Sequence, residues 1–255
     1  KVTFLPDKEI FEETVYDYDI LKQRLREMAF LTKGLKIRLT DERGEKELVK
    51  EFHYEGGIKE FVTYLNRSNV PLYDNVIYCE GKKDNVLVEV AMQHNDSYTE
   101  NIYSFVNNIN TPEGGTHLTG FKTTFTTVMN MYARQIGVLK EKDPNFTGAD
   151  IRNGMTAVVS IKHPDPRFEG QTKTKLDNQD AAKVVAKVTG DELVRYFDRN
   201  LETLKSIIGC AEKAAKIRKT EEKAKTNMLT KQKFSFDSNG KLANCESRDA
   251  SKCEI

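Results

Sequence analysis

The sequence predicts a mixed α/β (α+β) fold, because segments with the two-residue period of strands alternate with segments that have a helical period. Residues 86–93 (VLVEVAMQ) alternate apolar and polar side chains, as a strand with one buried face does. Residues 118–136 and 193–215 repeat apolar side chains at helical spacing. Strands are expected at residues 35–39, 47–54, 75–81, 86–93, 101–108 and 155–161.

The first fifty residues predict a strand, a helix and a hairpin. Residues 2–4 (VTF) have extended character and are followed by a proline turn. Asp17 or Asp19 is a suitable N-cap for the helix, and Gly34 is a suitable residue just after its end. The sequence DERG at residues 41–44 then predicts the turn of the hairpin.

The middle of the chain predicts a short helix followed by a sheet. A glycine pair opens the helix within residues 55–68, and we expect a domain boundary near this point. Residues 82–85 (KKDN) predict a tight turn between two strands. The face of the long helix at 118–136 opposite its apolar stripe carries Lys122, Thr126, Asn130 and Arg134.

The C-terminal part predicts one unusually long helix. From Asp191 onward the chain has no proline and only one glycine before Gly240, and an apolar stripe runs along residues 193–215. A helix from about 191 to about 225 would be roughly 50 Å long at 1.5 Å per residue, which suggests a strut. Residues 212–233 carry eight Lys/Arg and three Glu, an excess of five positive charges.

Composition excludes several classes of protein. Forty Lys/Arg and 39 Asp/Glu leave a net charge of +1, which argues against a chain-wide nucleic-acid coat. The sequence has no apolar run of about 18 residues and no signal-peptide pattern, so we expect a cytoplasmic protein without membrane association. The four cysteines and four histidines are scattered, so we expect free thiols and no metal site.

The loop at residues 164–176 (PDPRFEGQTKTKL) is a candidate binding site. Its two prolines stop the preceding strand, and Gly170 permits an unusual backbone angle. If the loop is extended, Gln171 and Lys173 point the same way, so an amide and an ammonium group converge on one point. A phosphate would suit these donors. The alternative is an ordinary solvated loop that is basic.

Three other features have both a functional and a structural interpretation. The glycine pair in 113–121 (EGGTHLTGF) could present backbone N–H groups to an anion, or form a tight turn into a helix capped by Thr116. Lys122 and Arg134 could contact nucleic-acid phosphates, or simply be solvated. The basic residues in 212–233 could bind DNA or keep the helix soluble.

No motif of a self-sufficient catalytic site is present. The sequence has no GxGxxG, GxxxxGK[ST], GxSxG or HExxH segment. We therefore predict no catalytic residue in this chain. The lack of a phosphate-binding glycine loop beside a catalytic acid also argues against a small-molecule kinase.

Five segments, in order along the chain, closely resemble the B subunits of bacterial DNA gyrases. The B subunits of topoisomerase IV share several of these segments and are the alternative within the same family of type IIA topoisomerases. The five segments lie at residues 17–43, 53–66, 100–123, 164–176 and 241–255.

The resemblance implies a domain organisation that periodicity could not reveal. Residues 1–48 would be the last strand, helix and hairpin of a GHKL ATPase domain. Residues 49–230 would be the transducer domain, similar to domain 2 of ribosomal protein S5, with a left-handed βαβ unit and a long C-terminal helix. Residues 231–255 would be a linker that leads into a Toprim domain.

The resemblance also implies site residues. Gln171 and Lys173 match a QTK loop that contacts the γ-phosphate of ATP, so they would sense the nucleotide before hydrolysis. Lys122 matches a basic residue that faces the cavity for transported DNA. The family residues that bind adenine, Mg²⁺ and the attacking water precede residue 1, so ATP and Mg²⁺ would belong to the full-length subunit. The chain alone would bind neither and would not hydrolyse ATP.

The implied function is the coupling of ATP binding and hydrolysis to DNA strand passage and negative supercoiling. The implied partners are DNA, an A-type subunit in an A2B2 heterotetramer, and a second B-type subunit. Decatenation by a topoisomerase IV is the alternative within the family. A non-catalytic nucleic-acid-binding module with an S5-like fold is the alternative from another class.

Overall fold

The computed structural model describes residues 1–234. The chain divides into two units, Lys1–Glu212 and Lys213–Ile255. In the second unit the described residues belong to helix α6 (Leu201–Phe234), where Arg218 and Glu222 form an ion pair with an N–O distance of 3.0 Å. Most of the predicted linker at 231–255, and all of the segment 241–255, lie outside the described residues.

A five-stranded mixed sheet forms the centre of the first unit. The strands lie in the order β3-β4-β7-β5-β6, and β7 is antiparallel to β4 and parallel to β5. Helix α3 (Thr116–Gln135) lies between β5 and β7 along the chain, which completes a βαβ unit. The strands are β3 (Ile77–Lys83), β4 (Val86–His94), β5 (Asn101–Val106), β6 (Ile109–Asn110) and β7 (Met155–Lys162).

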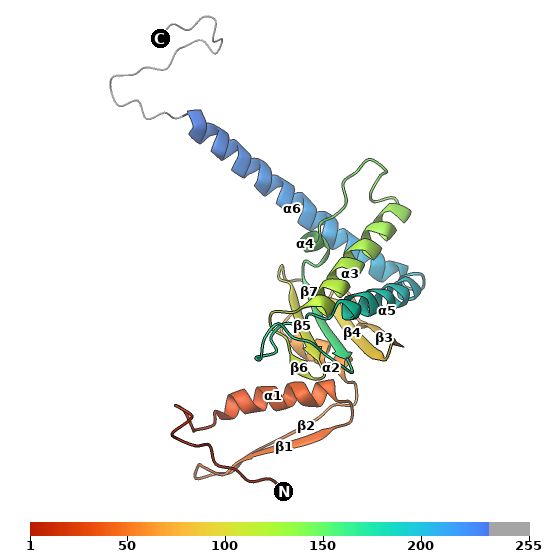
Figure 1. The fold of residues 1–255 in the computed structure, drawn as a ribbon. Coiled ribbons are helices and arrows are strands. Elements are labelled where there is room, and N and C mark those ends of the chain that lie inside the picture. The colour runs from red at the N-terminus through yellow and green to blue at the C-terminus, as the bar shows by residue number, and fades with distance from the viewer. Residues whose placement is uncertain (235–255) are drawn as a thin grey trace, which may run out of the picture. The chain divides into compact units, whose positions relative to one another are not determined.

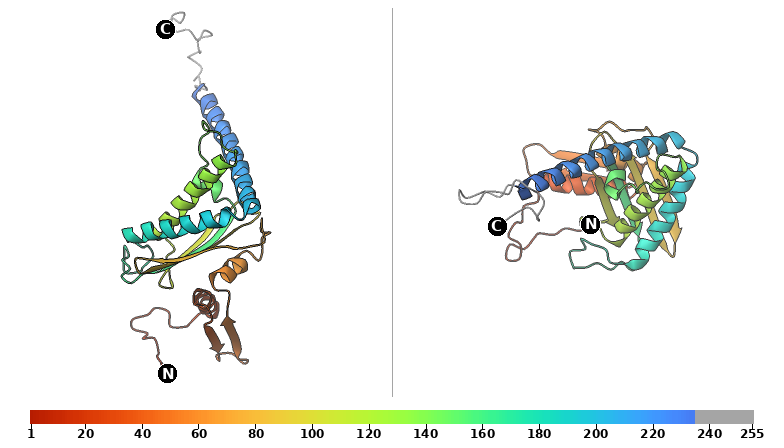
Figure 2. Two further views of the ribbon diagram at one scale, coloured as in Figure 1. Left: turned by 90° about the vertical axis from the view of Figure 1, so that its right-hand side faces the viewer. Right: turned by 90° about the horizontal axis from the view of Figure 1, so that it is seen from above.

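Helices cover both faces of this sheet. Helices α3 and α5 (Gln179–Phe197) lie on one face and α2 (Ile58–Leu65) on the other (Figures 1 and 2). Gly120 allows α3 and α5 to approach closely, because a Cβ there would lie 2.5 Å from the carbonyl oxygen of Ala182. The predicted alternation in β4 is confirmed, although its second face is also covered.

The N-terminal region forms helix α1 (Tyr18–Leu31) and a hairpin of β1 (Lys36–Asp41) and β2 (Leu48–His53). Asp17 is the N-cap, as one of the two predicted candidates, and its Oδ1 accepts a 3.0 Å hydrogen bond from the N–H of Ile20. Strand β2 extends past the predicted boundary between residues 48 and 49, which stays a prediction. The predicted strand at residues 2–4 is wrong, because no described strand pairs with this segment.

An aromatic cluster joins α1 to α2 and the sheet. The ring of Phe30 stacks on Phe61 and Tyr54, with centroids 4.7 and 3.6 Å apart. Ala91 of β4 and Phe105 of β5 belong to the same buried cluster. Apolar burial on this face therefore attaches the N-terminal helix to the sheet, at roughly 1.5–3 kcal/mol for each fully buried large side chain.

Two tight turns in the sheet use left-handed residues. Asp84 and Asn85 have φ of 49° and 62° and form the predicted turn between β3 and β4. Asn107 and Asn108 have φ of 50° and 65° and form a second such turn between β5 and β6. The predicted strand at 101–108 therefore ends at Val106, because both asparagines leave the extended region.

The predicted single helix from about 191 to about 225 is wrong, because the chain breaks between α5 and α6. The side-chain amide Nδ2 of Asn200 donates a 2.7 Å hydrogen bond to the carbonyl of Tyr196, and so satisfies a carbonyl in the last turn of α5. The carbonyl of Asn200 then accepts the first bond of α6, from Leu204. The apolar stripe is largely buried, but it continues across two helices.

A short helix, α4 (Gly148–Ile151), precedes β7 and begins with a capping box between Thr147 and Asp150. None of the helices among residues 1–234 is both long enough and apolar enough to cross a membrane.

Candidate functional site

The candidate loop folds back on itself between β7 and α5. The N–H of Asp177 donates to the carbonyl of Arg167 at 2.8 Å, and the N–H of Glu169 donates to the carbonyl of Lys175 at 3.0 Å. At the tip, the N–H of Lys173 donates to the carbonyl of Gly170 at 3.1 Å and closes a turn. We call residues 164–177 the tip loop.

The extended geometry predicted for Gln171 and Lys173 is wrong. Gln171 lies inside the turn, and Lys173 closes it with φ of 56°, a left-handed conformation that is uncommon for lysine. The unusual backbone angle therefore belongs to Lys173 and not to Gly170. Both residues are nevertheless exposed at the tip, in the same turn.

The ammonium group of Lys173 has no carboxylate partner among the described residues, and neither it nor the amide of Gln171 makes a described hydrogen bond. The other cations of the loop are paired. Lys175 lies 2.7 Å from Glu169, whose hydrogen bond raises the pKa of the lysine, and Arg167 lies 3.7 Å from Asp165. The tip loop therefore keeps one positive charge available, at Lys173, for an external anion.

The outgoing limb of the tip loop is bound to the segment before α3. The N–H of Glu113 donates to the carbonyl of Thr174 at 3.1 Å, and the N–H of Thr116 donates to the carbonyl of Leu176 at 3.0 Å. Gly115 permits this approach, because a Cβ there would lie 2.4 Å from the carbonyl oxygen of Leu176. The glycine pair therefore supports the loop, and the N–H of Thr116 is not directed at an anion.

The predicted N-cap of α3 is wrong by one residue. Gly115 occupies the cap position without a side-chain hydrogen bond, and Thr116 is the first helical residue. The hydroxyl of Thr116 is buried without a described hydrogen-bond partner. The close approach of the backbone to Leu176 decides this geometry, because only glycine fits at the cap.

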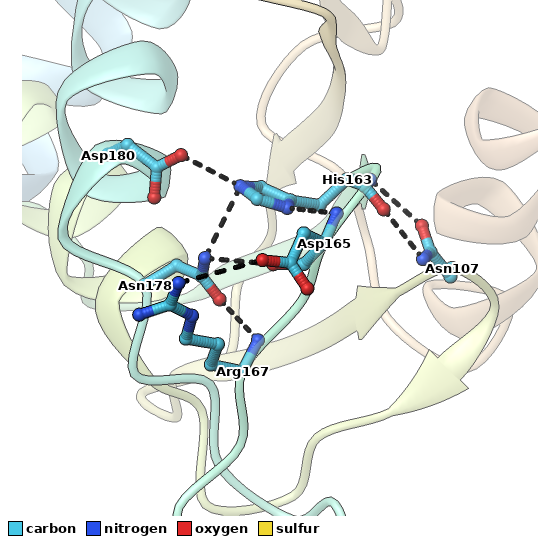
Figure 3. Close-up of polar contacts among 6 residues, drawn as sticks. All are labelled: Asn107, His163, Asp165, Arg167, Asn178 and Asp180. Carbon is cyan, nitrogen blue, oxygen red and sulfur yellow. Dashed lines mark hydrogen bonds and ion pairs between the residues drawn. The ribbon is translucent and has the colours of Figure 1, made fainter.

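The base of the tip loop rests on four polar side chains, Asn107, His163, Asn178 and Asp180, which we call the base cluster (Figure 3). His163 is almost fully buried, and its Nε2 lies 3.0 Å from Oδ2 of Asp180. Its Nδ1 accepts a 3.1 Å hydrogen bond from the N–H of Asp165. Nδ1 is therefore unprotonated, so Nε2 carries the proton and donates it to Asp180.

The carboxylate of Asp180 suits this role. Its limited burial would raise its pKa, but hydrogen bonds from His163 and Asn178 outweigh that effect and hold the pKa below its ordinary value. The group is thus an anion at neutral pH and accepts the proton of His163. The base of the loop is fixed by charge-assisted bonds at one side of an otherwise exposed segment.

Lys122 lies in an ion-pair group with Glu100 and Arg152. Its Nζ is 2.5 Å from Oε1 of Glu100, and Nε of Arg152 is 3.0 Å from Oε2 of the same carboxylate. Burial alone would raise the pKa of Glu100, but the two cations lower it. The three groups together carry one net positive charge, with the side chain of Lys122 35% exposed.

The other polar residues of α3 do not form a free solvated face. Arg134 donates to the carbonyls of Lys140 and Asp143 and to Oδ1 of Asn145, at 2.6, 2.9 and 2.7 Å. Asn130 is buried and exchanges two hydrogen bonds with the backbone of Phe146. These two side chains hold the loop that follows α3, so the alternative in which Arg134 is simply a solvated cation is wrong.

Within the described part of the chain, no group of three or more His, Cys, Asp or Glu side chains could hold a metal ion. Of the cysteines in the described part of the chain, Cys79 is buried and Cys210 is half-buried.

A family model described as DNA gyrase B matches residues 57–227 of the chain. The chain belongs to the DNA gyrase B family. It is 52% identical to the DNA gyrase B protein of Clostridium acetobutylicum and 49% identical to that of Halalkalibacterium halodurans, in both cases over 100% of this chain and 40% of the relative. The chain thus spans about two fifths of the length of these gyrase proteins.

Two solved structures, one of a gyrase B and one of a topoisomerase IV, have a similar fold. The 43K ATPase domain of Thermus thermophilus gyrase B, in complex with an aminocoumarin, is 37% identical with a TM-score of 0.73, over 87% of this chain and 59% of that one. The topoisomerase IV ATP-binding domain of Francisella tularensis, in complex with a small-molecule inhibitor, is 28% identical with a TM-score of 0.69, over 84% and 57%. The predicted family and fold class are confirmed.

The sequence did not reveal the side chains that position Lys122 or those that support the tip loop. Glu100 and Arg152 are 22 and 30 residues from Lys122 along the chain, and no local pattern connects them. Asn107 could have been found, because an Asn-Asn pair between two apolar runs is a turn signal of the same kind as the predicted DN turn. His163 had only its position before the first proline as a signal.

Proposed function

We propose that this chain is part of the ATPase subunit of a type II DNA topoisomerase of the gyrase class, in which it couples the nucleotide state to DNA strand passage and negative supercoiling. Residues 1–48 would close the GHKL ATPase domain, 49–230 would form the transducer domain, and 231–255 would lead into a Toprim domain. The full-length protein would act in the cytoplasm.

The unpaired charge of Lys173 at the tip of a braced loop carries this proposal. A lysine held in this way can donate to the γ-phosphate of ATP, with Gln171 as a neighbouring amide donor. ADP lacks the γ-phosphate, so the contact exists only before hydrolysis. ATP therefore favours the arrangement in which the tip loop reaches the nucleotide, and hydrolysis removes that preference.

The full subunit would use ATP and Mg²⁺. The described residues supply donors for a phosphate but no group of acidic ligands for the cation, so other parts of the subunit would hold the metal. When bound, Mg²⁺ would neutralise phosphate charge during hydrolysis. We expect no turnover from this chain alone.

Lys122 is the proposed DNA contact, because the group that it forms with Glu100 and Arg152 keeps a net positive charge at a partly exposed position. A duplex in the cavity of the enzyme would compete with Glu100 for the ammonium group. The proposed partners are DNA, an A-type subunit in an A2B2 assembly, and a second B-type subunit. Decatenation by a topoisomerase IV remains the second candidate, given the 28% identity to a member of that group.

The test uses the intact subunit assembled with its A-type partner. Lys173→Ala should lower ATP turnover and supercoiling by at least tenfold, since a charge-assisted hydrogen bond contributes about 1.5–3 kcal/mol. Lys175→Ala is the matched control, because Lys175 is paired with Glu169 and should leave both activities nearly unchanged. Activities of the Lys173 variant within a few-fold of the unmodified subunit would refute the sensing role.

A further inference from the structure

We propose that Asn107, acting through the base cluster, is a positioning residue that sets the place of Lys173. This inference rests on the proposed sensing role and adds a second requirement to it. The contact with the γ-phosphate would need a correctly held loop base as well as the lysine. Asn107 itself lies at the β5–β6 turn, far along the chain from the loop tip.

Asn107 clamps the residue that precedes the loop. Its Nδ2 donates to the carbonyl of His163 at 2.9 Å, and its Oδ1 accepts from the N–H of the same residue at 2.9 Å (Figure 3). Two bonds to one peptide residue fix both its position and its direction. The left-handed backbone of Asn107 is one that asparagine adopts more readily than most residues.

The segment HPDPR at residues 163–167 is the incoming limb of the tip loop, and every backbone N–H in it has a hydrogen-bond acceptor. The N–H groups of His163, Asp165 and Arg167 donate to Asn107, to the ring of His163 and to Asn178, respectively. The two intervening residues are prolines and have no N–H to satisfy. Each donor of the limb therefore ends on a side chain of the base cluster.

The cluster also ties the incoming limb to α5. Asp180 in the first turn of α5 accepts from His163, and Nδ2 of Asn178 donates to the carbonyl of Asp165 at 3.1 Å. The adjacent Asn108 extends the connection in the other direction, because its Nδ2 donates to Oγ1 of Thr32 at 3.1 Å. Thr32 caps the end of α1, so one hydrogen-bonded path connects α1 to the start of the tip loop.

If the clamp is removed, the tip loop should occupy its competent position for a smaller fraction of the time. The apparent dissociation constant of a ligand rises in inverse proportion to that fraction. The effect should fall on nucleotides that carry a γ-phosphate, because only they contact Lys173 in the proposed mechanism. ADP affinity should be unchanged, which separates a positioning role from general loss of structure.

The experiment compares Asn107→Gly with Asn85→Gly in the intact subunit. Glycine keeps the left-handed backbone at both turns, and of the two asparagines only Asn107 clamps the residue that precedes the tip loop. The measurement is the affinity for a non-hydrolysable ATP analogue and for ADP. We expect Asn107→Gly to lower the affinity for the analogue at least fivefold and to leave the affinity for ADP within twofold of the unmodified subunit. Asn85→Gly should change neither affinity.

A second pair of variants acts at an exposed side chain, where folding is not at risk. Asp180→Ala should lower the affinity for the analogue at least threefold. Asp180→Asn should restore that affinity, because the amide oxygen of asparagine still accepts a hydrogen bond from His163. Normal analogue affinity in both Asn107→Gly and Asp180→Ala would overturn the inference. Lys173→Ala, measured in parallel, separates the two ideas: if it too binds the analogue normally, the sensing role itself fails.

Discussion

Two buried histidines should make the fold sensitive to mild acid. His94 and His117 are fully buried, and burial lowers the pKa of each imidazole to about 4. In the unfolded chain the same groups titrate near pH 6.5. The unfolded state therefore takes up protons first as the pH falls, so the free energy of unfolding decreases from about pH 6.5 down to about pH 4.

The free energy of unfolding should fall by about 1.2 kcal/mol per histidine between pH 7 and pH 5.5, or by about 2.5 kcal/mol for the pair. In this range most carboxylates stay ionised, so they add little to the slope. Urea unfolding of the chain at several pH values measures the loss directly.

Variants assign that loss to the buried groups. His117→Met, which removes one titrating group and keeps an apolar side chain of similar size, should halve the pH dependence. His53→Gln controls for the loss of a histidine at an exposed site. A pH dependence below about 0.5 kcal/mol, or one that His117→Met leaves unchanged, would refute the argument.

Three further substitutions test other parts of the structure. Gly115→Ala should lower the free energy of unfolding by about 2 kcal/mol or more in urea titrations, because its Cβ would lie 2.4 Å from a backbone oxygen; an unchanged midpoint would contradict that packing. Arg134→Ala should cost about 1–2 kcal/mol and speed proteolysis of residues 137–146, whereas equal cleavage rates would show that its hydrogen bonds do not hold that loop. Lys122→Gln in the intact enzyme should reduce the slope of log DNA affinity against log salt by about 0.9; an unchanged slope would dismiss the DNA contact.

Local patterns predicted the elements whose stability is decided locally. The strand β4 shows its alternation, Asp17 caps α1, and the left-handed pair Asp84 and Asn85 makes the turn written in the sequence. In each case one segment of chain contains the whole signal, either as a period or as a side chain that bonds the backbone nearby.

Several of the wrong predictions share a different cause, since a partner distant in the sequence decides them. The break before α6 depends on Asn200 and on contacts of α5 with α3, where the hydroxyl of Tyr132 bonds the carboxylate of Asp198 at 2.6 Å. The tip loop closes into a turn because its outgoing limb is bound to the segment before α3. Side chains such as Asn107 gain their role only when the fold places them beside His163.

Binding of the γ-phosphate by Lys173 is tested most directly by a structure of the intact subunit. Crystals of the subunit with a non-hydrolysable ATP analogue and with ADP provide the comparison. We predict that Nζ of Lys173 lies about 2.7–2.9 Å from a γ-phosphate oxygen with the analogue and contacts no phosphate with ADP. A distance of more than about 6 Å between Nζ of Lys173 and the γ-phosphate of the analogue, or a contact between Lys173 and a phosphate of ADP as well, would contradict the sensing role.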